Sequence, residues 1–251
     1  MKNFQSAGHE LDKFKEETNS LVVSYLTLRK LVGLLGMLLP FFLAVSPSRS
    51  SEFLFNLEPS ISDYFFTSRG DILVVVLCLI GFFLLVYNGY TLVERVLMGV
   101  AGICAMGVAF APTRQACLAC DLSVHTGAGG FLGNLAGTWW HFFFAVVFFL
   151  SLAVISTFYF TRGKSGKIDW RMMGKVSQKN RRNLVYVVCG VVMVVCLLIL
   201  AVYFIYRAKT GHDLRPYPVV YIFETVAVEA FGFSWLVKGE ALWPDPGNGL
   251  F

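Results

Sequence analysis

The stretch LVYVVCGVVMVVCLLILAVYFIY, residues 184–206, decides the fold class of this chain. It contains no Asp, Glu, Lys or Arg, and its apolar residues would cover every face of a helix. About 20 residues, each rising ~1.5 Å, cross the hydrocarbon core of a bilayer. The stretch therefore predicts a membrane-spanning helix. A transmembrane β-strand is excluded because its apolar and polar residues would alternate.

Further apolar stretches of similar kind lie on both sides of it. They are residues 31–45, extending back toward Leu26, and residues 72–90, 97–111, 138–159 and 217–237. Of the 251 residues 56% are apolar and only 15% are charged, and the mean hydropathy is +0.65. This composition is typical of an integral membrane protein. We expect an all-α polytopic bundle of six transmembrane helices over residues 26–238, between cytoplasmic segments 1–25 and 239–251.

The basic residues predict the orientation of these spans. With both termini inside, fifteen of the 21 Lys and Arg residues lie on the inner side and six on the outer side. An excess of Lys and Arg marks cytoplasmic loops, so we expect both termini in the cytoplasm. The net charge of +5 then reflects topology, and no nucleic-acid partner is expected. Residues 1–20 are strongly charged without an apolar run, so no cleavable signal peptide is expected.

Two carboxylates, Glu224 and Glu229, lie inside the last apolar stretch. An ionised carboxylate costs several kcal/mol inside a bilayer, so such residues usually face the protein and carry function. Their spacing of five places them about 140° apart around a helix, on different faces. We expect Glu229 to be the deeper and more protected acid, with Arg95 as its plausible basic partner. A structural interhelical hydrogen bond and a functional acid both remain open for Glu229.

A polar stripe leads into the fourth span. Asn134, Thr138 and His141 are spaced by four and three residues, so they share one helical face. Beside it runs a glycine stripe, at Gly129, Gly133 and Gly137, which would let another helix approach closely. His141 is either a buried histidine that satisfies a neighbouring helix or a residue that carries protons or binds a ligand. We expect it to face Glu224 across a hydrated polar pocket, open to the outer side.

The first outer loop holds another concentration of polar residues before the second span, including Asp63, Arg69 and Asp71. Arg69 and Asp71 could simply pair at the membrane interface. Three histidines and one of the aspartates could in principle bind zinc. These histidines are His125, His141 and His212. They are scattered over separate segments, and no metal site is predicted.

The six cysteines divide by position. Cys78, Cys104, Cys189 and Cys196 lie in spans, where cysteine behaves as a small apolar residue. Cys117 and Cys120 form a C-x-x-C in a loop predicted to face outward. A local disulfide or a free pair is the favoured interpretation. A redox pair and a metal site remain as alternatives.

Several stretches resemble one family of bacterial membrane proteins. They are SYLTLRKLVGLLGMLLP (24–40), SISDYFFTSRGDILV (60–74), GFFLLVYNGY (81–90), WHFFFAVVFF (140–149) and AFGFSWLVKGE (230–240). The family is uncharacterised, is described only as a domain of unknown function, and is loosely similar to the six-span DRAM/Sfk group. The resemblance implies a single six-span domain and no established activity or cofactor. It places Asp63, Tyr64, Arg69, Asp71, His141 and Trp235 in family-like motifs.

Three functional classes follow from these observations. The leading hypothesis is an integral membrane protein that binds a lipid or small ligand, or supports a membrane complex, through an outward-facing pocket. A proton-coupled transporter using Glu224, Glu229 and His141 is the second. The third is a metal-dependent membrane hydrolase similar to alkaline ceramidases, although the paired histidines of the last helix of those enzymes are missing. The sequence identifies neither the ligand nor a protein partner, and whether the chain is an enzyme stays open.

Overall fold

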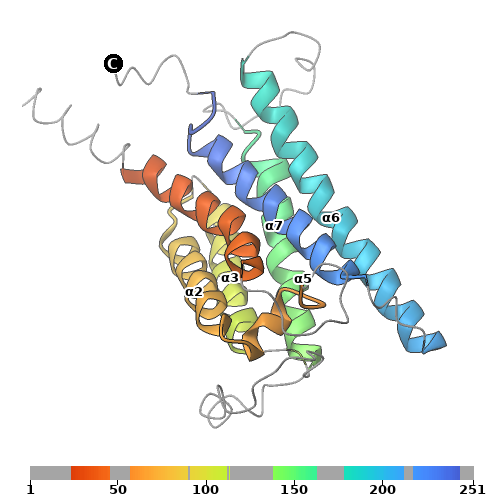
Figure 1. Ribbon diagram of the computed structural model, residues 1–251. Helices are drawn as coiled ribbons and strands as arrows, with labels where there is room; N and C mark the ends of the chain where they lie inside the picture. The colour runs from red at the N-terminus through yellow and green to blue at the C-terminus, as the bar shows by residue number, and fades with distance from the viewer. Residues whose placement is uncertain are drawn as a thin grey trace, which may run out of the picture.

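The computed structural model describes residues 24–45, 57–89, 91–111, 113, 138–162, 178–211 and 217–243, and the regular structure in these residues is helical. The helices are a first helix, Ser24–Ala44, followed by α2 (Gly70–Val86), α3 (Leu92–Phe110), α5 (Thr138–Val154), α6 (Gln178–Thr210) and α7 (Val219–Lys238). A 3₁₀ helix, η1 (Ser62–Phe66), precedes α2, and a π-helical segment, η2 (Ile155–Tyr159), continues α5. Figure 1 shows the long helices packed into one bundle.

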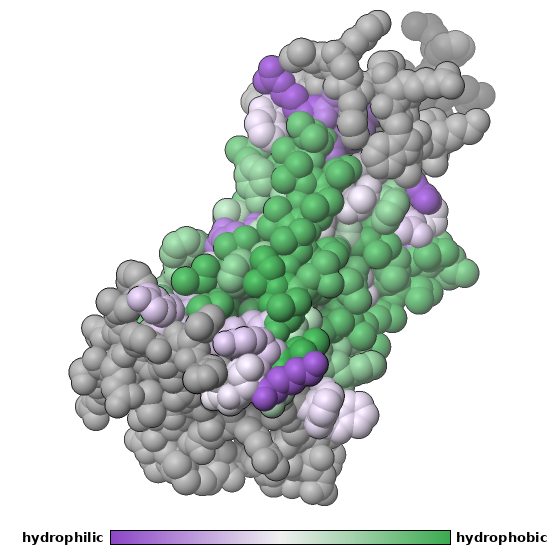
Figure 2. Space-filling model, turned by 90° about the vertical axis from the view of Figure 1, so that its right-hand side faces the viewer, coloured by the Kyte–Doolittle hydropathy of each residue, from purple (hydrophilic) through white to green (hydrophobic). Residues whose placement is uncertain are grey.

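The outer surface of the bundle is apolar. Five helices are long and apolar enough to cross a membrane, namely the first helix, α3, α5 with η2, α6 and α7, while α2 is apolar but has 17 residues. Large side chains such as Phe41, Phe82 and Ile103 are more than half exposed on their outer faces. Figure 2 shows hydrophobic residues as a band across one face of the molecule, with hydrophilic residues toward both ends. Soluble monomers rarely expose so much apolar surface, and the helices are typical of a multi-pass membrane protein.

Successive helices run in alternating directions (Figure 1). At one end of the bundle, called here the Arg29 end, Arg29 of the first helix donates from Nη1 to the carbonyl oxygen of Lys238, at 3.4 Å. At the opposite end, the Glu224 end, the Tyr221 hydroxyl of α7 donates to the carbonyl oxygen of Pro40, at 2.8 Å. The first helix and the last therefore lie antiparallel and side by side, although the whole chain separates them.

Two pairs of glycines let helix backbones touch. A Cβ atom on Gly33 of the first helix would lie 2.8 Å from the Gly232 carbonyl oxygen of α7, and one on Gly232 would lie 2.7 Å from the Gly33 oxygen. The same reciprocal contact joins α2 and α3, where a Cβ on Gly102 would lie 2.6 Å from the Gly81 oxygen. Small residues at such crossings are the usual means of close helix packing in a bilayer.

The start of α3 differs from the predicted span because a capping side chain sets it. The third span was expected over 97–111, but α3 begins at Leu92 because the Thr91 side chain accepts a hydrogen bond from the Glu94 backbone N–H, at 3.2 Å. Glu94 therefore lies in the first turn of the helix, and its side chain is 3% exposed. The predicted glycine stripe at 129–137 lies outside the described residues.

Candidate functional site

The site begins with the segment at 57–61, which lies against the start of α7. Two hydrogen bonds hold it there. The Tyr221 backbone N–H donates to the Pro59 carbonyl oxygen, at 2.9 Å, and the Ile61 backbone N–H donates to Oε2 of Glu224, at 2.7 Å. The first bond satisfies an N–H group that the helix start leaves without an intrahelical partner. The segment belongs to the predicted first outer loop, and these bonds hold it against α7.

Asp63 is buried in η1, with 3% of its side chain exposed. Its Oδ2 accepts a hydrogen bond from the Ser60 hydroxyl, at 2.8 Å, and its backbone N–H donates to the same hydroxyl, at 3.2 Å. Reciprocal bonds of this kind close a short turn. Ile61, two positions before Asp63, donates to Oε2 of Glu224, so Asp63 lies near that carboxyl group. Asp63 therefore makes the Glu224 end more acidic while it shapes the turn.

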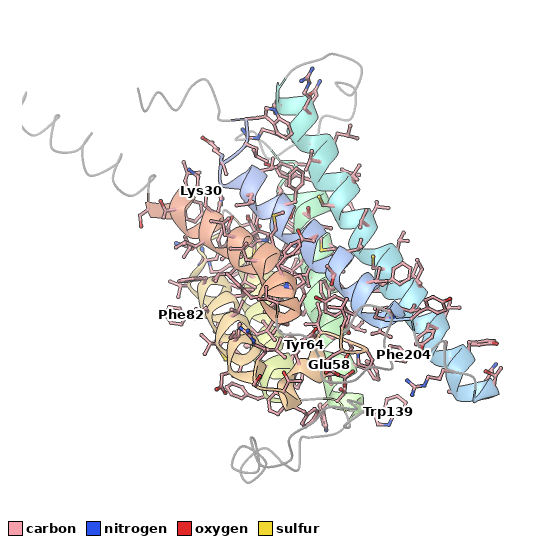
Figure 3. All side chains as sticks on the ribbon, viewed as in Figure 1. Lys30, Glu58, Tyr64, Phe82, Trp139 and Phe204 are labelled. Carbon is pink, nitrogen blue, oxygen red and sulfur yellow. The ribbon has the colours of Figure 1, made fainter. Side chains whose placement is uncertain are left out.

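Tyr64 anchors η1 through its hydroxyl and its ring. Its hydroxyl accepts a hydrogen bond from the Glu58 backbone N–H, at 3.4 Å, and its ring lies 6.0 Å from that of Tyr221. Figure 3 shows Tyr64 and Glu58 at this end of the bundle. Burial raises the pKa of Tyr64 to about 12, and the hydrogen bond from Glu58 opposes this rise. The phenol therefore stays protonated at neutral pH and serves as packing rather than as an acid.

A partly open cavity of about 70 Å³ lies behind this segment, between the first helix, η1, α2, α3, α5 and α7. The cavity is lined by Leu39, Ile61, Ser62, Phe65, Leu73, Leu77, Val108, His141, Ala145, Phe148, Phe149, Glu224 and Val228. Glu224 and His141 thus border the same cavity. The lining is apolar apart from these two residues and Ser62, whereas a polar pocket was expected.

Each of the two polar residues is held through one atom and leaves another unused. Nδ1 of His141 lies 2.9 Å from the Ala111 carbonyl oxygen at the end of α3. A carbonyl can only accept, so Nδ1 carries the proton, and in a neutral ring Nε2 is an acceptor. Among the described residues, neither Nε2 of His141 nor Oε1 of Glu224 has a hydrogen-bond partner. These two unused atoms belong to residues that line the cavity.

Glu229 does not match the role expected for it. Its side chain is half-buried, and its Oε1 is enclosed without a hydrogen-bond partner among the described residues. Arg95 is exposed and forms no ion pair with it. The interhelical bond considered for Glu229 is therefore not seen in this part of the chain, and Glu224 is the carboxylate with a defined partner.

The other predicted residues lie apart from the cavity lining. Arg69 is half-buried at the N-cap of α2 and Asp71 is exposed in its first turn, with no ion pair between them in the described structure. Thr138 begins α5, but its side chain lies outside the described atoms. Outside the described residues lie Asn134, Cys117, Cys120, His125 and His212. Within the described ranges no three His, Cys, Asp or Glu residues are grouped to hold a metal ion, and the four span cysteines are free thiols.

A second polar group, not expected from the sequence, lies at the Arg29 end. Arg29 is 4% exposed, and its Nη2 donates to the Tyr87 hydroxyl, at 2.7 Å. That hydroxyl donates to Oε1 of Glu94, at 3.3 Å. The guanidinium carbon lies 4.1 Å from the centre of the Tyr25 ring, a cation–π distance. We call Tyr25, Arg29, Tyr87 and Glu94 the arginine cluster.

The arginine cluster joins helices that are far apart in the sequence. The Tyr87 ring packs edge to face on Trp235 of α7, at 5.4 Å between centroids, and Trp235 packs in the same way on Phe160, at 5.5 Å. Lys238 donates from Nζ to the Phe160 carbonyl oxygen, at 3.1 Å. The cluster thus ties the first helix, α2, α3, α7 and the end of η2 together. None of its four residues lines the cavity at the Glu224 end, and we interpret the cluster as a structural element.

Comparison with known proteins assigns the chain to no family. No protein-family model matches the sequence, and neither a curated protein nor a solved structure shows significant similarity to it.

Proposed function

We propose that this chain is a six-span protein of a bacterial inner membrane that binds the polar end of a small amphipathic molecule in the cavity at the Glu224 end. The observation that carries the proposal is the presence of Glu224 and His141, together with Ser62, in a cavity whose other lining residues are apolar. Ligand sites are typically apolar spaces with a few convergent polar groups. The resemblance to an uncharacterised six-span family is compatible with this function but names no activity.

The proposal requires one membrane span besides the five long helices, and α2 supplies it. It is short for a spanning helix, with 17 residues, but it lies along α3 through the Gly81 and Gly102 crossing. Its start lies near the Glu224 end, where η1 precedes it, and its end lies at the Arg29 end, where Tyr87 meets Arg29. About 17 residues is the lower limit for a spanning helix. The excess of Lys and Arg on the Arg29 side supports a cytoplasmic location for that end.

Cysteine labelling tests this topology. In a background in which Cys117 and Cys120 are replaced by Ser, a membrane-impermeant maleimide should modify Ser68→Cys in intact cells. Asn88→Cys and Lys175→Cys should react only after permeabilisation. Ser68 and Asn88 flank α2, and both are exposed on the protein surface. A difference in their labelling therefore reports the side of the membrane rather than burial in the protein. Equal labelling of Ser68→Cys and Asn88→Cys in intact cells would show that α2 does not cross.

The cavity volume limits what it can hold. An apolar protein cavity of about 150 Å³ is large enough for benzene, and the present cavity has about 70 Å³. It would therefore take a polar group and its first few carbon atoms, while the rest of a longer molecule would extend through the opening. The apolar walls favour the carbon atoms by burial. The unused acceptors on Glu224 and His141 would orient the polar group.

A cavity-filling variant tests the proposal. Trifluorobutanol, followed by fluorine NMR on the protein in nanodiscs, should bind the wild type. Ala145→Phe should weaken this binding by about tenfold or more, because the larger ring would occupy the space that the probe needs. The control is Val146→Phe, which adds a phenyl ring on the exposed face of α5. Ala153→Phe would not serve as a control, because Ala153 is buried and a larger side chain there would disturb the packing. Equal binding to Ala145→Phe and Val146→Phe would contradict the proposal.

A proton-coupled transporter is the second candidate. It is favoured by the presence of three titratable groups, Asp63, His141 and Glu224, at or beside the cavity. Chains of such groups form proton paths in transporters. Proton uptake by protein-containing vesicles under an imposed pH gradient, lost in Glu224→Gln, would favour this function over simple binding.

A further inference from the structure

The cavity has the chemistry of a site for a cation with N–H donors. We propose that the molecule bound there carries a primary ammonium group on an alkyl chain. This inference rests on the proposed function, because it names the class of ligand that the same cavity takes.

The hydrogen-bonding atoms of the cavity decide the argument. The Ile61 N–H already occupies Oε2 of Glu224, and the Ala111 carbonyl already fixes the proton of His141 on Nδ1. The remaining atoms are Oε1 of Glu224, which is an acceptor when the carboxyl group is ionised, and Nε2 of His141, which is an acceptor in a neutral imidazole. Both residues line one small space, and a ligand with at least two donors would satisfy both acceptors. A primary ammonium supplies three, whereas a hydroxyl supplies one.

The charges point in the same direction. Glu224 lines the cavity, and Asp63 lies two positions from Ile61, which donates to Glu224. Among the described residues that line the cavity, none is Lys or Arg. A carboxylate removed from water costs free energy unless it is paired, and an ammonium bonded to it offsets that cost. An anionic ligand would instead add a like charge to an apolar space.

The apolar walls determine the chemistry of the rest of the ligand. Leu39, Phe148 and Val228 come from three different helices and offer no hydrogen-bonding side chains. A polar molecule such as a sugar or a peptide would lose hydrogen bonds to water against such walls. An ammonium followed by methylene groups loses less, because its chain makes the apolar contacts and two of its three N–H groups meet the acceptors. Alkylamines and the amine ends of longer amphiphiles fit this description.

One set of probes tests the inference without any variant. Trifluorobutylammonium, trifluorobutanol and trifluorobutanoate share one chain and differ in the head group. In nanodiscs of zwitterionic lipid, which lack a surface charge to attract the amine, fluorine NMR should show the ammonium binding wild-type protein at least about tenfold more tightly than the alcohol. The carboxylate should bind least. A trimethylated ammonium, which keeps the charge but has no N–H, should bind at least about fivefold more weakly than the primary amine.

A pair of variants on α7 assigns the effect to one residue. Glu224→Gln keeps an oxygen to accept from Ile61 and removes the charge, so it should weaken ammonium binding by about tenfold or more and alcohol binding by less than about threefold. Glu229→Gln, which makes the same change outside the cavity lining, should leave both within about twofold. The two failures are distinguishable. If the alcohol and the ammonium bind equally well and both lose binding in Ala145→Phe, the cavity is a binding site but its preference for an ammonium is wrong. If binding does not change in Ala145→Phe, the cavity is not the binding site. Should Glu224→Gln fail to fold, the head-group comparison on the wild type still decides.

Discussion

Arg29→Met should destabilise the protein by about 3–5 kcal/mol, the usual cost of removing one partner from a buried charged network. Arg29 is 4% exposed and donates to the Tyr87 hydroxyl, which in turn donates to Glu94. Without the guanidinium, Glu94 remains a buried carboxylate whose bridging hydroxyl has lost its cation. The Lys238 carbonyl at the end of α7 loses a donor as well. Thermal unfolding in detergent should show a midpoint about 10 °C lower.

The matched control is an arginine at the same end that faces outward. Arg95 follows Glu94 directly in α3 but is exposed, so Arg95→Met should change the unfolding free energy by less than about 0.5 kcal/mol. Tyr87→Phe, which removes the bridging hydroxyl and keeps the ring, should fall between the two, with a loss of about 1–3 kcal/mol. Similar stabilities for Arg29→Met and Arg95→Met would show that the cluster does not hold the bundle together.

Gly102→Val should separate α2 from α3 and cost about 3 kcal/mol, the upper part of the range for overpacking. A Cβ atom there would lie 2.6 Å from the Gly81 carbonyl oxygen, a backbone atom that cannot rotate away. The two helices would have to move apart along their contact. The folded fraction after purification and the midpoint of thermal unfolding should both fall.

Gly99 provides the control for this substitution. It lies on the same helix, and a Cβ atom there meets no other atom within 4 Å. Gly99→Val therefore carries the same change in helix propensity without the steric conflict, and it should be neutral or slightly stabilising, by up to about 0.5 kcal/mol. A loss of stability equal to that of Gly102→Val would indicate that valine in α3, not the crossing, is responsible.

The helices could be read from the sequence because their signal is local. A run of apolar residues long enough to cross a bilayer, such as 184–206, predicts a helix whatever surrounds it. The observed α6 is longer at both ends because polar residues continue it beyond the apolar run. For the same local reason, Glu224 and His141 were identifiable as polar residues inside apolar stretches.

The partners of individual side chains could not be read in this way. Glu94 is buried and its neighbour Arg95 is exposed, which depends on the rotation of α3 that the cap at Thr91 and the contact with α2 set. Arg29 counted in the sequence as one more basic residue near a span end, yet its partner Tyr87 lies 58 positions away. Nothing in the segment 57–61 signals that the Ile61 backbone N–H would bond to Glu224. These contacts are long-range, and a single sequence carries no direct sign of them.

The contact between the first helix and α7 sets the order in which the molecule can be completed. Arg29 and Lys238 are 209 positions apart. At a synthesis rate of about 5–20 residues per second, the first helix waits roughly 10–40 s for the partner that covers Gly33 and accepts from Arg29. During this interval a charged side chain and an open glycine face lie at the membrane without their final neighbours. Assembly of this protein therefore ends with its last helix. A nascent chain that stops before Val219 leaves the Gly33 face of the first helix uncovered, where the cellular machinery for membrane insertion and quality control can detect it.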